Sequence, residues 1–112
     1  MQSFRYAVRG IITAYREERQ MKVHTAVAVM AVVCGIVADL SRAEWAILIL
    51  TIAMVITLEL VNTAAERIVD MVTEEYHPLA EKAKDIAAGA VLVGAVASVI
   101  VGICLVGTSV IE

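Results

Sequence analysis

Four polar residues share one face of an otherwise apolar helix in the middle of this 112-residue chain. Glu59, Asn62, Glu66 and Asp70 directly follow the uncharged run 45–58, and the last three stand three, seven and eleven positions after Glu59. At about 100° per residue, they stay within roughly a quarter of the helix circumference. Three carboxylates and an amide on one face could bind a cation, accept a proton or join helices by hydrogen bonds. We call these four residues the polar stripe.

Glu59 is the most costly member of the polar stripe. No helix breaker interrupts residues 45–70, so at about 1.5 Å per residue Glu59 lies about 20 Å beyond Trp45. This depth is still inside a hydrocarbon layer about 30 Å thick, where a carboxylate costs on the order of a few kcal/mol. Glu66 lies about 10 Å further along, toward water. We therefore predict that Glu59 is a functional group that faces protein or water, and that the stripe crosses the boundary between lipid and water.

The composition indicates a single-domain integral membrane protein covering residues 1–112. Hydrophobic residues make up 61% of the chain, and the mean hydropathy is +0.85. Soluble domains are usually about 45–50% apolar. The net charge of −3 says little, because the placement of charges matters more than their sum, but the sequence shows no strongly basic surface for nucleic acid. The two cysteines, Cys34 and Cys104, lie in apolar runs without metal-site spacing, so we expect them to be buried as small hydrophobic residues.

The chain divides into an amino-terminal helix and three apolar spans, so the predicted fold class is all-α. In residues 3–20 the apolar side chains recur on one face of a helix and the arginines on another. This pattern favours an amphipathic helix on the membrane surface. The predicted spans are about 22–40, 42–71 and 80–111. Ser41, followed by Glu44 three residues later, predicts a capping box at the start of the second span.

The basic residues predict the orientation of these spans. Five of them precede the first span and three surround the connection between the second and third spans, whereas only Arg42 lies at the other end. By the positive-inside rule, the amino terminus and the region 67–84 are cytoplasmic. With no signal-peptide core in the first twenty residues, we expect an uncleaved multi-pass protein of the bacterial cytoplasmic membrane, with the polar stripe opening toward the cytoplasm.

The polar groups on the cytoplasmic side are suited to a magnesium–nucleotide site. They are Glu17, Glu18, the polar stripe, Glu74, Glu75, Tyr76, His77, Lys84 and Asp85. Mg²⁺ is held by one or two carboxylates together with water and substrate phosphates. Phosphoryl transfer also needs a cation on the phosphates and a group that positions the attacking hydroxyl. At the depth of Glu59, that hydroxyl would belong to a lipid alcohol.

The residues by themselves leave three functions open, namely a lipid kinase, a small proton-coupled transporter and a structural membrane oligomer. Soluble nucleotide motifs such as GxxxxGK[ST] and DFG are absent. An intramembrane glutamate also suits a proton relay in a small proton-coupled transporter. In a structural membrane oligomer, Glu59 and Asn62 would only link helices by hydrogen bonds.

Three strings resemble the signature of the prokaryotic diacylglycerol kinase / undecaprenol kinase family. They are ELVNTAAERIVD at 59–70, EYH at 75–77 and AKDIAAGAVL at 83–92. The likeness extends over nearly the whole chain. It implies a homotrimer of three-span protomers, each with a surface helix, that phosphorylates a membrane lipid alcohol with ATP and Mg²⁺.

The resemblance also implies a role for each matching residue. Glu59 matches the proton acceptor for the lipid hydroxyl, and Glu18 and Glu66 match metal-binding carboxylates. Lys84 and Asp85 match nucleotide contacts, as do Tyr6, Glu75, Tyr76 and His77. Asn62 and Asp70 match supporting polar positions of the motif.

The likeness is greater to the shorter undecaprenol kinase branch. The string EEYHPLA at 74–80 and the short amino terminus are similar to that branch. This favours undecaprenol as the substrate, with diacylglycerol as the alternative. The first span is the least similar part, and His24 stands there where some members carry another polar residue.

Overall fold

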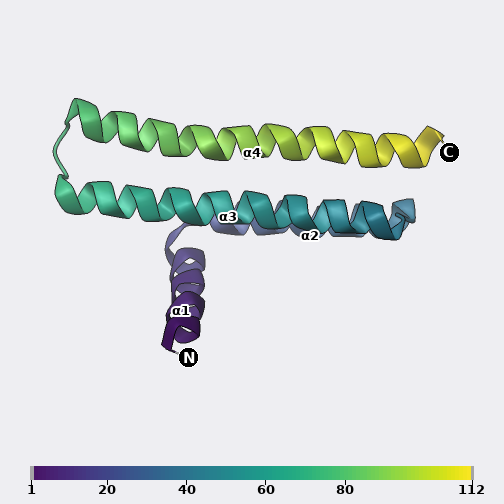
Figure 1. Cartoon of the computed structure of the whole chain (residues 1–112), viewed down its shortest axis with the longest axis horizontal. Coiled ribbons are helices and arrows are strands. Elements are labelled where there is room, and N and C mark those ends of the chain that lie inside the picture. The colour runs from purple at the N-terminus through teal and green to yellow at the C-terminus, as the bar shows by residue number, and fades with distance from the viewer. Residues whose placement is uncertain (1, 112) are drawn as a thin grey trace.

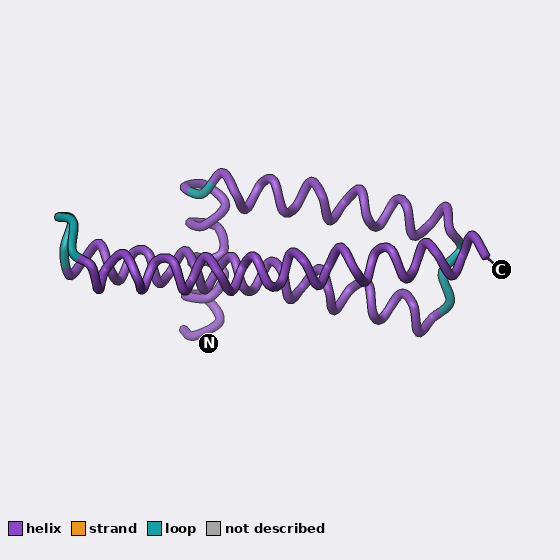
Figure 2. The backbone as a smooth tube through the Cα atoms, turned by 90° about the horizontal axis from the view of Figure 1, so that it is seen from above, coloured by secondary structure: helices purple, strands orange, loops and turns teal. Residues whose placement is uncertain are grey.

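The computed structural model is all-helical and describes residues 2–111, with side chains described for residues 2–107. The described elements are α1 (Gln2–Glu17), α2 (Arg19–Ala38), α3 (Arg42–Val72) and α4 (Pro78–Ile111). Met1 and Glu112, the ends of the predicted domain, lie outside the described residues. The three long helices run alongside one another, while α1 lies across them (Figures 1 and 2).

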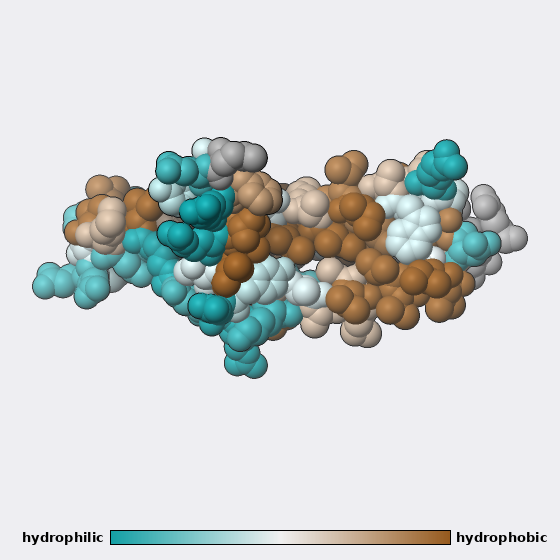
Figure 3. Space-filling view, turned by 90° about the horizontal axis from the view of Figure 1, so that it is seen from below, coloured by the Kyte–Doolittle hydropathy of each residue, from teal (hydrophilic) through white to brown (hydrophobic). Residues whose placement is uncertain are grey.

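The three long helices form a multi-pass membrane bundle. Helices α2 and α3, and α4 from Pro78 to Gly107, are each long and apolar enough to cross a membrane. Helix α3 packs most extensively on α4, and α2 packs mainly on α3. In Figure 3 hydrophobic residues cover the face from its centre toward the right, and hydrophilic residues gather left of centre, around α1, with a smaller group at the right-hand end. This distribution is what a bilayer requires, because apolar side chains can face lipid there.

The face of α3 that is buried against the other helices carries mainly polar side chains. Its buried residues are Leu48, Glu59, Asn62 and Thr63. The apolar residues on its other faces, such as Leu50 and Val61, are exposed. The expected burial of the cysteines is wrong, because Cys34 and Cys104 are both exposed on the helices. In a bilayer an apolar side chain gains no more from protein than from lipid, so polarity decides which residues turn inward.

The turn between α2 and α3 has the predicted capping box. The Ser41 side chain accepts a hydrogen bond from the Glu44 backbone N–H at 3.2 Å, and the Glu44 carboxylate accepts one from the Ser41 N–H at 2.9 Å. Asp39 ends α2 in the left-handed conformation, with φ of 57°. These contacts satisfy backbone groups that would otherwise lack partners at the helix ends.

The break between α1 and α2 falls earlier than predicted. We expected one helix over 3–20, but α1 ends at Glu17, and Glu18 has an extended backbone. Met21, just after the break, has a fully buried side chain. Tyr15 of α1 and Thr25 of α2 join the two helices by a 2.5 Å hydrogen bond between their hydroxyls. The break lets α1 turn away from the bundle while Glu18 stays in contact with α3.

The predicted long second span is present, and α4 begins slightly earlier than expected. With 31 residues, α3 is about 45 Å long, which exceeds the hydrocarbon thickness. Helix α4 starts at Pro78 rather than near Ala80. Proline is well tolerated at the first helical position, where its missing N–H would have no partner. The last turns of α3 and the first turns of α4 therefore project together beyond the apolar region.

Gly94 of α4 leaves room for the Leu58 side chain where α4 packs on α3. A Cβ atom there would overlap Cδ1 of Leu58, whereas a Cβ at Gly102 would meet no atom within 4 Å. We predict that Gly94→Leu lowers the free energy of unfolding by about 1–3 kcal/mol, because the larger side chain forces the helices apart. Unfolding in detergent micelles measures this, with Gly102→Leu as the matched control. Equal losses in the two variants would contradict the prediction.

Candidate active site

The Glu59 carboxylate lies in the interior of the bundle, against α2. Glu59 is only 4% exposed. Its Oε2 atom is 3.2 Å from Nε2 of His24, in the second turn of α2. No other polar contact of this carboxylate is found among the described residues. The pair offsets part of the cost of burying the carboxylate, and it leaves one carboxylate oxygen able to accept a proton.

The polar stripe continues from Glu59 toward the end of α3. The Asn62 side-chain amide donates a hydrogen bond to Oε1 of Glu66 at 3.3 Å. Oδ1 of Asn62 is buried and has no hydrogen-bond partner among the described residues. The Thr63 hydroxyl donates to the Glu59 carbonyl at 2.9 Å, one turn back on the same helix. Asn62 therefore offers an unused acceptor between Glu59 and Glu66.

Arg67 connects α3 to the break between α1 and α2. Its Nη2 atom is 2.7 Å from Oε1 of Glu18 and 2.9 Å from Oε1 of Glu17. Because Glu66 precedes Arg67 in α3, the Glu18 carboxylate is held near that part of the stripe. Because two carboxylates share one guanidinium, the cluster of Glu17, Glu18 and Arg67 has a net negative charge. Such a cluster suits a bound cation, which could in turn bind a nucleotide phosphate.

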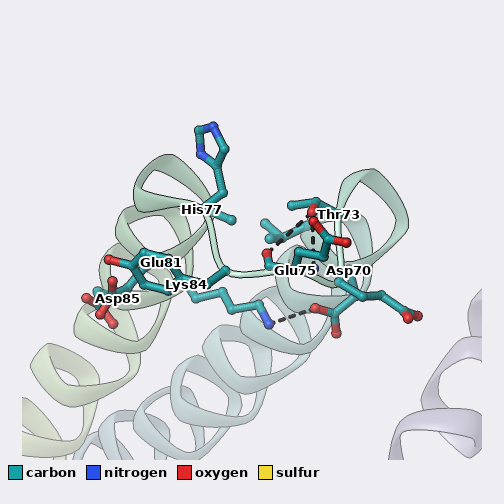
Figure 4. Close-up of a pocket in the computed structure, with 11 residues that line it drawn as sticks. Asp70, Thr73, Glu75, His77, Glu81, Lys84 and Asp85 are labelled. Carbon is teal, nitrogen blue, oxygen red and sulfur yellow. Dashed lines mark hydrogen bonds and ion pairs between the residues drawn. The ribbon is translucent and has the colours of Figure 1, made fainter.

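A cleft of about 440 Å³ lies beyond the stripe, between the ends of α3 and α4. Its lining residues are Val69, Asp70, Thr73, Glu74, Glu75, Tyr76, His77, Ala80, Glu81, Lys84 and Asp85. Figure 4 shows Lys84 reaching from α4 toward Asp70, with its Nζ 2.7 Å from Oδ1 of that residue. The connecting turn is held by Thr73, whose hydroxyl accepts from the Glu75 N–H at 3.2 Å. Lysine and several carboxylates thus surround one exposed space.

The structure gathers most of the predicted nucleotide residues at this cleft. Glu75, Tyr76, His77, Lys84 and Asp85 all line it. The other predicted residues lie elsewhere. Glu18 pairs with Arg67, and Glu66 accepts a hydrogen bond from Asn62. Tyr6 is on α1, where its ring centroid lies 5.8 Å from the Arg9 guanidinium carbon.

An apolar cleft adjoins the buried carboxylate on the side of the membrane interior. It has a volume of about 400 Å³ between α2, α3 and α4, and His24 is one of its lining residues. Its other lining residues are almost all apolar, including Val27, Val55 and Val99. Through His24, the cleft reaches the Glu59 carboxylate. An apolar chain with a polar end would find both environments here.

The carboxylates have the chemistry that a magnesium ion requires. Mg²⁺ binds oxygen, commonly through one or two carboxylates with water and phosphate completing its shell. Glu18 and Glu66 supply carboxylates, and the unpartnered Oδ1 of Asn62 can accept from a metal-bound water. No group of three or more histidine, cysteine, aspartate or glutamate side chains forms a metal site by itself in the described part of the chain. A metal held here would therefore rely on phosphate oxygens as well.

Sequence reasoning missed the partners of the two key carboxylates. His24 contacts Glu59, and Arg67 contacts Glu18, although neither was a predicted site residue. A histidine directly before the uncharged run 25–38 was the available signal for the first pair. No local signal marked the second, since Arg67 is 49 positions from Glu18 and lies beside the stripe rather than on it.

Comparison with known proteins relates this arrangement to a family. The profile of the family described as prokaryotic diacylglycerol kinase matches residues 5–106. An undecaprenol kinase of Bacillus subtilis is 48% identical over 103 residues, which cover 92% of this chain and 84% of that protein. A diacylglycerol kinase of Synechocystis is 46% identical over 104 residues, covering 92% of this chain but only 59% of that protein.

A more distant relative agrees with this result. The diacylglycerol kinase of Escherichia coli K12 is 30% identical over 95 residues, covering 85% of this chain and 78% of that protein. The family profile, which matches residues 5–106, includes α2, α3 and most of α4, with the stripe and the cleft. The chain belongs to the prokaryotic diacylglycerol kinase family, which is a family of lipid kinases.

Proposed function

We propose that the protein phosphorylates undecaprenol with Mg²⁺·ATP, producing undecaprenyl phosphate at the cytoplasmic face of a bacterial membrane. The observation that carries this proposal is the buried Glu59 carboxylate between an apolar cleft and a charged one. Similarity to the Bacillus undecaprenol kinase favours the polyprenyl alcohol. Diacylglycerol is the second candidate, because the Synechocystis relative is nearly as similar and is named for that substrate.

Glu59 takes the proton of the lipid hydroxyl as the hydroxyl oxygen attacks the γ-phosphorus of ATP, and ADP leaves with the electron pair of the broken bond between the γ-phosphorus and the bridging oxygen. A carboxylate that is buried and has a single partner keeps an oxygen for this proton. The lipid chain lies in the apolar cleft that His24 lines, which brings a terminal hydroxyl toward Glu59. Water is scarce at this depth, so transfer to the lipid is favoured over hydrolysis.

The charged groups bind the nucleotide. Lys84 offsets negative charge on the phosphates after exchanging its Asp70 partner for a phosphate oxygen. Asp85, Glu75, Tyr76 and His77 contact the nucleotide around the cleft. Glu18 and Glu66 hold Mg²⁺, which would supply positive charge to the phosphates when bound. Catalysis is then mainly positioning and electrostatic stabilisation.

We further propose that the working unit is a homotrimer with α1 on the membrane surface. Tyr6 does not line the nucleotide cleft of its own chain, so a neighbouring protomer is needed to bring it to a shared site. Few apolar side chains are buried within one chain, leaving broad helix faces available for association. On α1, Phe4, Val8 and Ile12 can enter the acyl boundary while nearby arginines meet headgroups.

The first test offers both lipids to the purified protein. Phosphate transfer from labelled ATP is measured in mixed micelles with Mg²⁺ and with undecaprenol and diacylglycerol in parallel. We expect labelled polyprenyl phosphate as the dominant product. Dominant phosphatidic acid would transfer the proposal to the second lipid, and no product from either lipid would contradict both.

Glu59→Gln separates proton transfer from nucleotide binding. The amide has the same shape but cannot accept the hydroxyl proton, so we expect turnover to fall at least about 100-fold. Nucleotide affinity, measured by equilibrium binding of labelled ATP with Mg²⁺, should change less than about twofold, since Glu59 does not line the charged cleft. An equal loss of ATP affinity would contradict this division of roles.

Glu66→Gln should weaken nucleotide binding, which Glu59→Gln is expected to leave nearly unchanged. Removing one of the two proposed metal carboxylates is expected to weaken Mg²⁺·ATP binding at least about 10-fold, because the remaining charge holds the ion less well. Titration of ATP binding against Mg²⁺ concentration checks this. A normal dissociation constant at every Mg²⁺ concentration would remove Glu66 from the metal site.

A further inference from the structure

His24 makes the one polar contact of the Glu59 carboxylate found among the described residues, and it comes from a different helix. The distance from Nε2 of His24 to Oε2 of Glu59 is 3.2 Å. The His24 side chain is 19% exposed and that of Glu59 6%, so solvent can replace this contact only in part. A carboxylate on a helix can rotate about its side-chain bonds, and one fixed donor is enough to choose its orientation.

We propose that His24 is a positioning residue that holds the Glu59 carboxylate for proton transfer. Its Nε2–H donates to Oε2, which leaves the other oxygen as the one that receives the hydroxyl proton. The inference rests on the proposed function, since it concerns the same carboxylate. It adds a residue of α2 to a site whose predicted members lie in α1, the α1–α2 break, α3, α4 and the turn between α3 and α4.

The surroundings of His24 support a role in orientation rather than in binding the nucleotide. His24 lines the apolar cleft between α2, α3 and α4, and it does not line the charged cleft that holds Lys84. The neighbouring Thr25 hydroxyl is bonded to Tyr15, so the start of α2 is fixed against α1. The histidine is therefore presented to Glu59 from an anchored helix, and its effect should appear in turnover rather than in ATP affinity.

His24→Ala and His24→Gln test the proposal in the full-length protein. With His24→Ala we expect kcat to fall about 10- to 100-fold, with the KM for ATP within about twofold of the wild type. Glutamine can extend an amide donor to a similar reach, so His24→Gln should recover at least about fivefold of the loss. Imidazole added to His24→Ala should also restore part of the turnover. Val29→Ala is the matched control, because Val29 is an exposed residue of α2 outside both clefts.

A measurement without turnover distinguishes this inference from the proposed function. In ¹⁵N-histidine spectra, the His24 ring signals of Glu59→Gln should be shifted from those of the wild type, and the signals of Val29→Ala should match the wild type. If these shifts are seen but the wild type phosphorylates no lipid, the proposed function is overturned, and the positioning role is overturned with it. Lipid phosphorylation by the wild type with normal kcat in His24→Ala would overturn only the role of His24. A loss confined to the KM for lipid would do so too, because His24 would then bind the lipid instead.

Discussion

The constraint on which the structure depends is the burial of the Glu59 carboxylate in the apolar part of a helical bundle. Lipid tails offer Glu59 no hydrogen bond, so the charge must turn toward protein and find a donor there. The contact found there is with Nε2 of His24, 3.2 Å away, and it joins α2 to the same part of α3 that carries the polar stripe. The pair thus links helix packing to the proposed chemistry, because the contact that makes burial tolerable involves the carboxylate to which we assign the proton transfer.

The excess length of α3 divides the site by environment. Its apolar part packs on α4 and α2, whereas its last turns, with Glu66 and Asp70, extend to the level of the connecting turn. There the side chains form ion pairs that water can loosen, such as Lys84 with Asp70 and Arg67 with the Glu17–Glu18 pair. Exposed pairs of this kind contribute little to stability. They are therefore suited to exchanging partners with a phosphate or a cation.

The two clefts give opposite surroundings to the two substrates of a lipid kinase. One is bordered by carboxylates and a lysine, and the other is almost wholly apolar. Glu59 and His24 lie where the apolar cleft meets the polar stripe, so a hydroxyl on an apolar chain can meet a phosphate without the chain leaving the membrane. Few helices are needed for this arrangement, because the bilayer itself supplies most of the apolar environment.

The sequence determined the helical fold and which polar residues are the candidates for the chemistry. Apolar runs of sufficient length predict spans, Ser41 and Glu44 predict the helix start, and the family signature singles out the polar stripe and the turn at 75–77. These features are local, because helix periodicity and capping act within a few residues. The expected burial of Cys34 and Cys104 failed because hydrophobicity does not drive a residue inward in a bilayer. Only the tertiary structure decided that α1 stops at Glu17, that His24 meets Glu59 and that Arg67 meets Glu18. Those contacts join residues 35 and 49 positions apart, and such pairings are fixed by how whole helices pack rather than by any nearby residue.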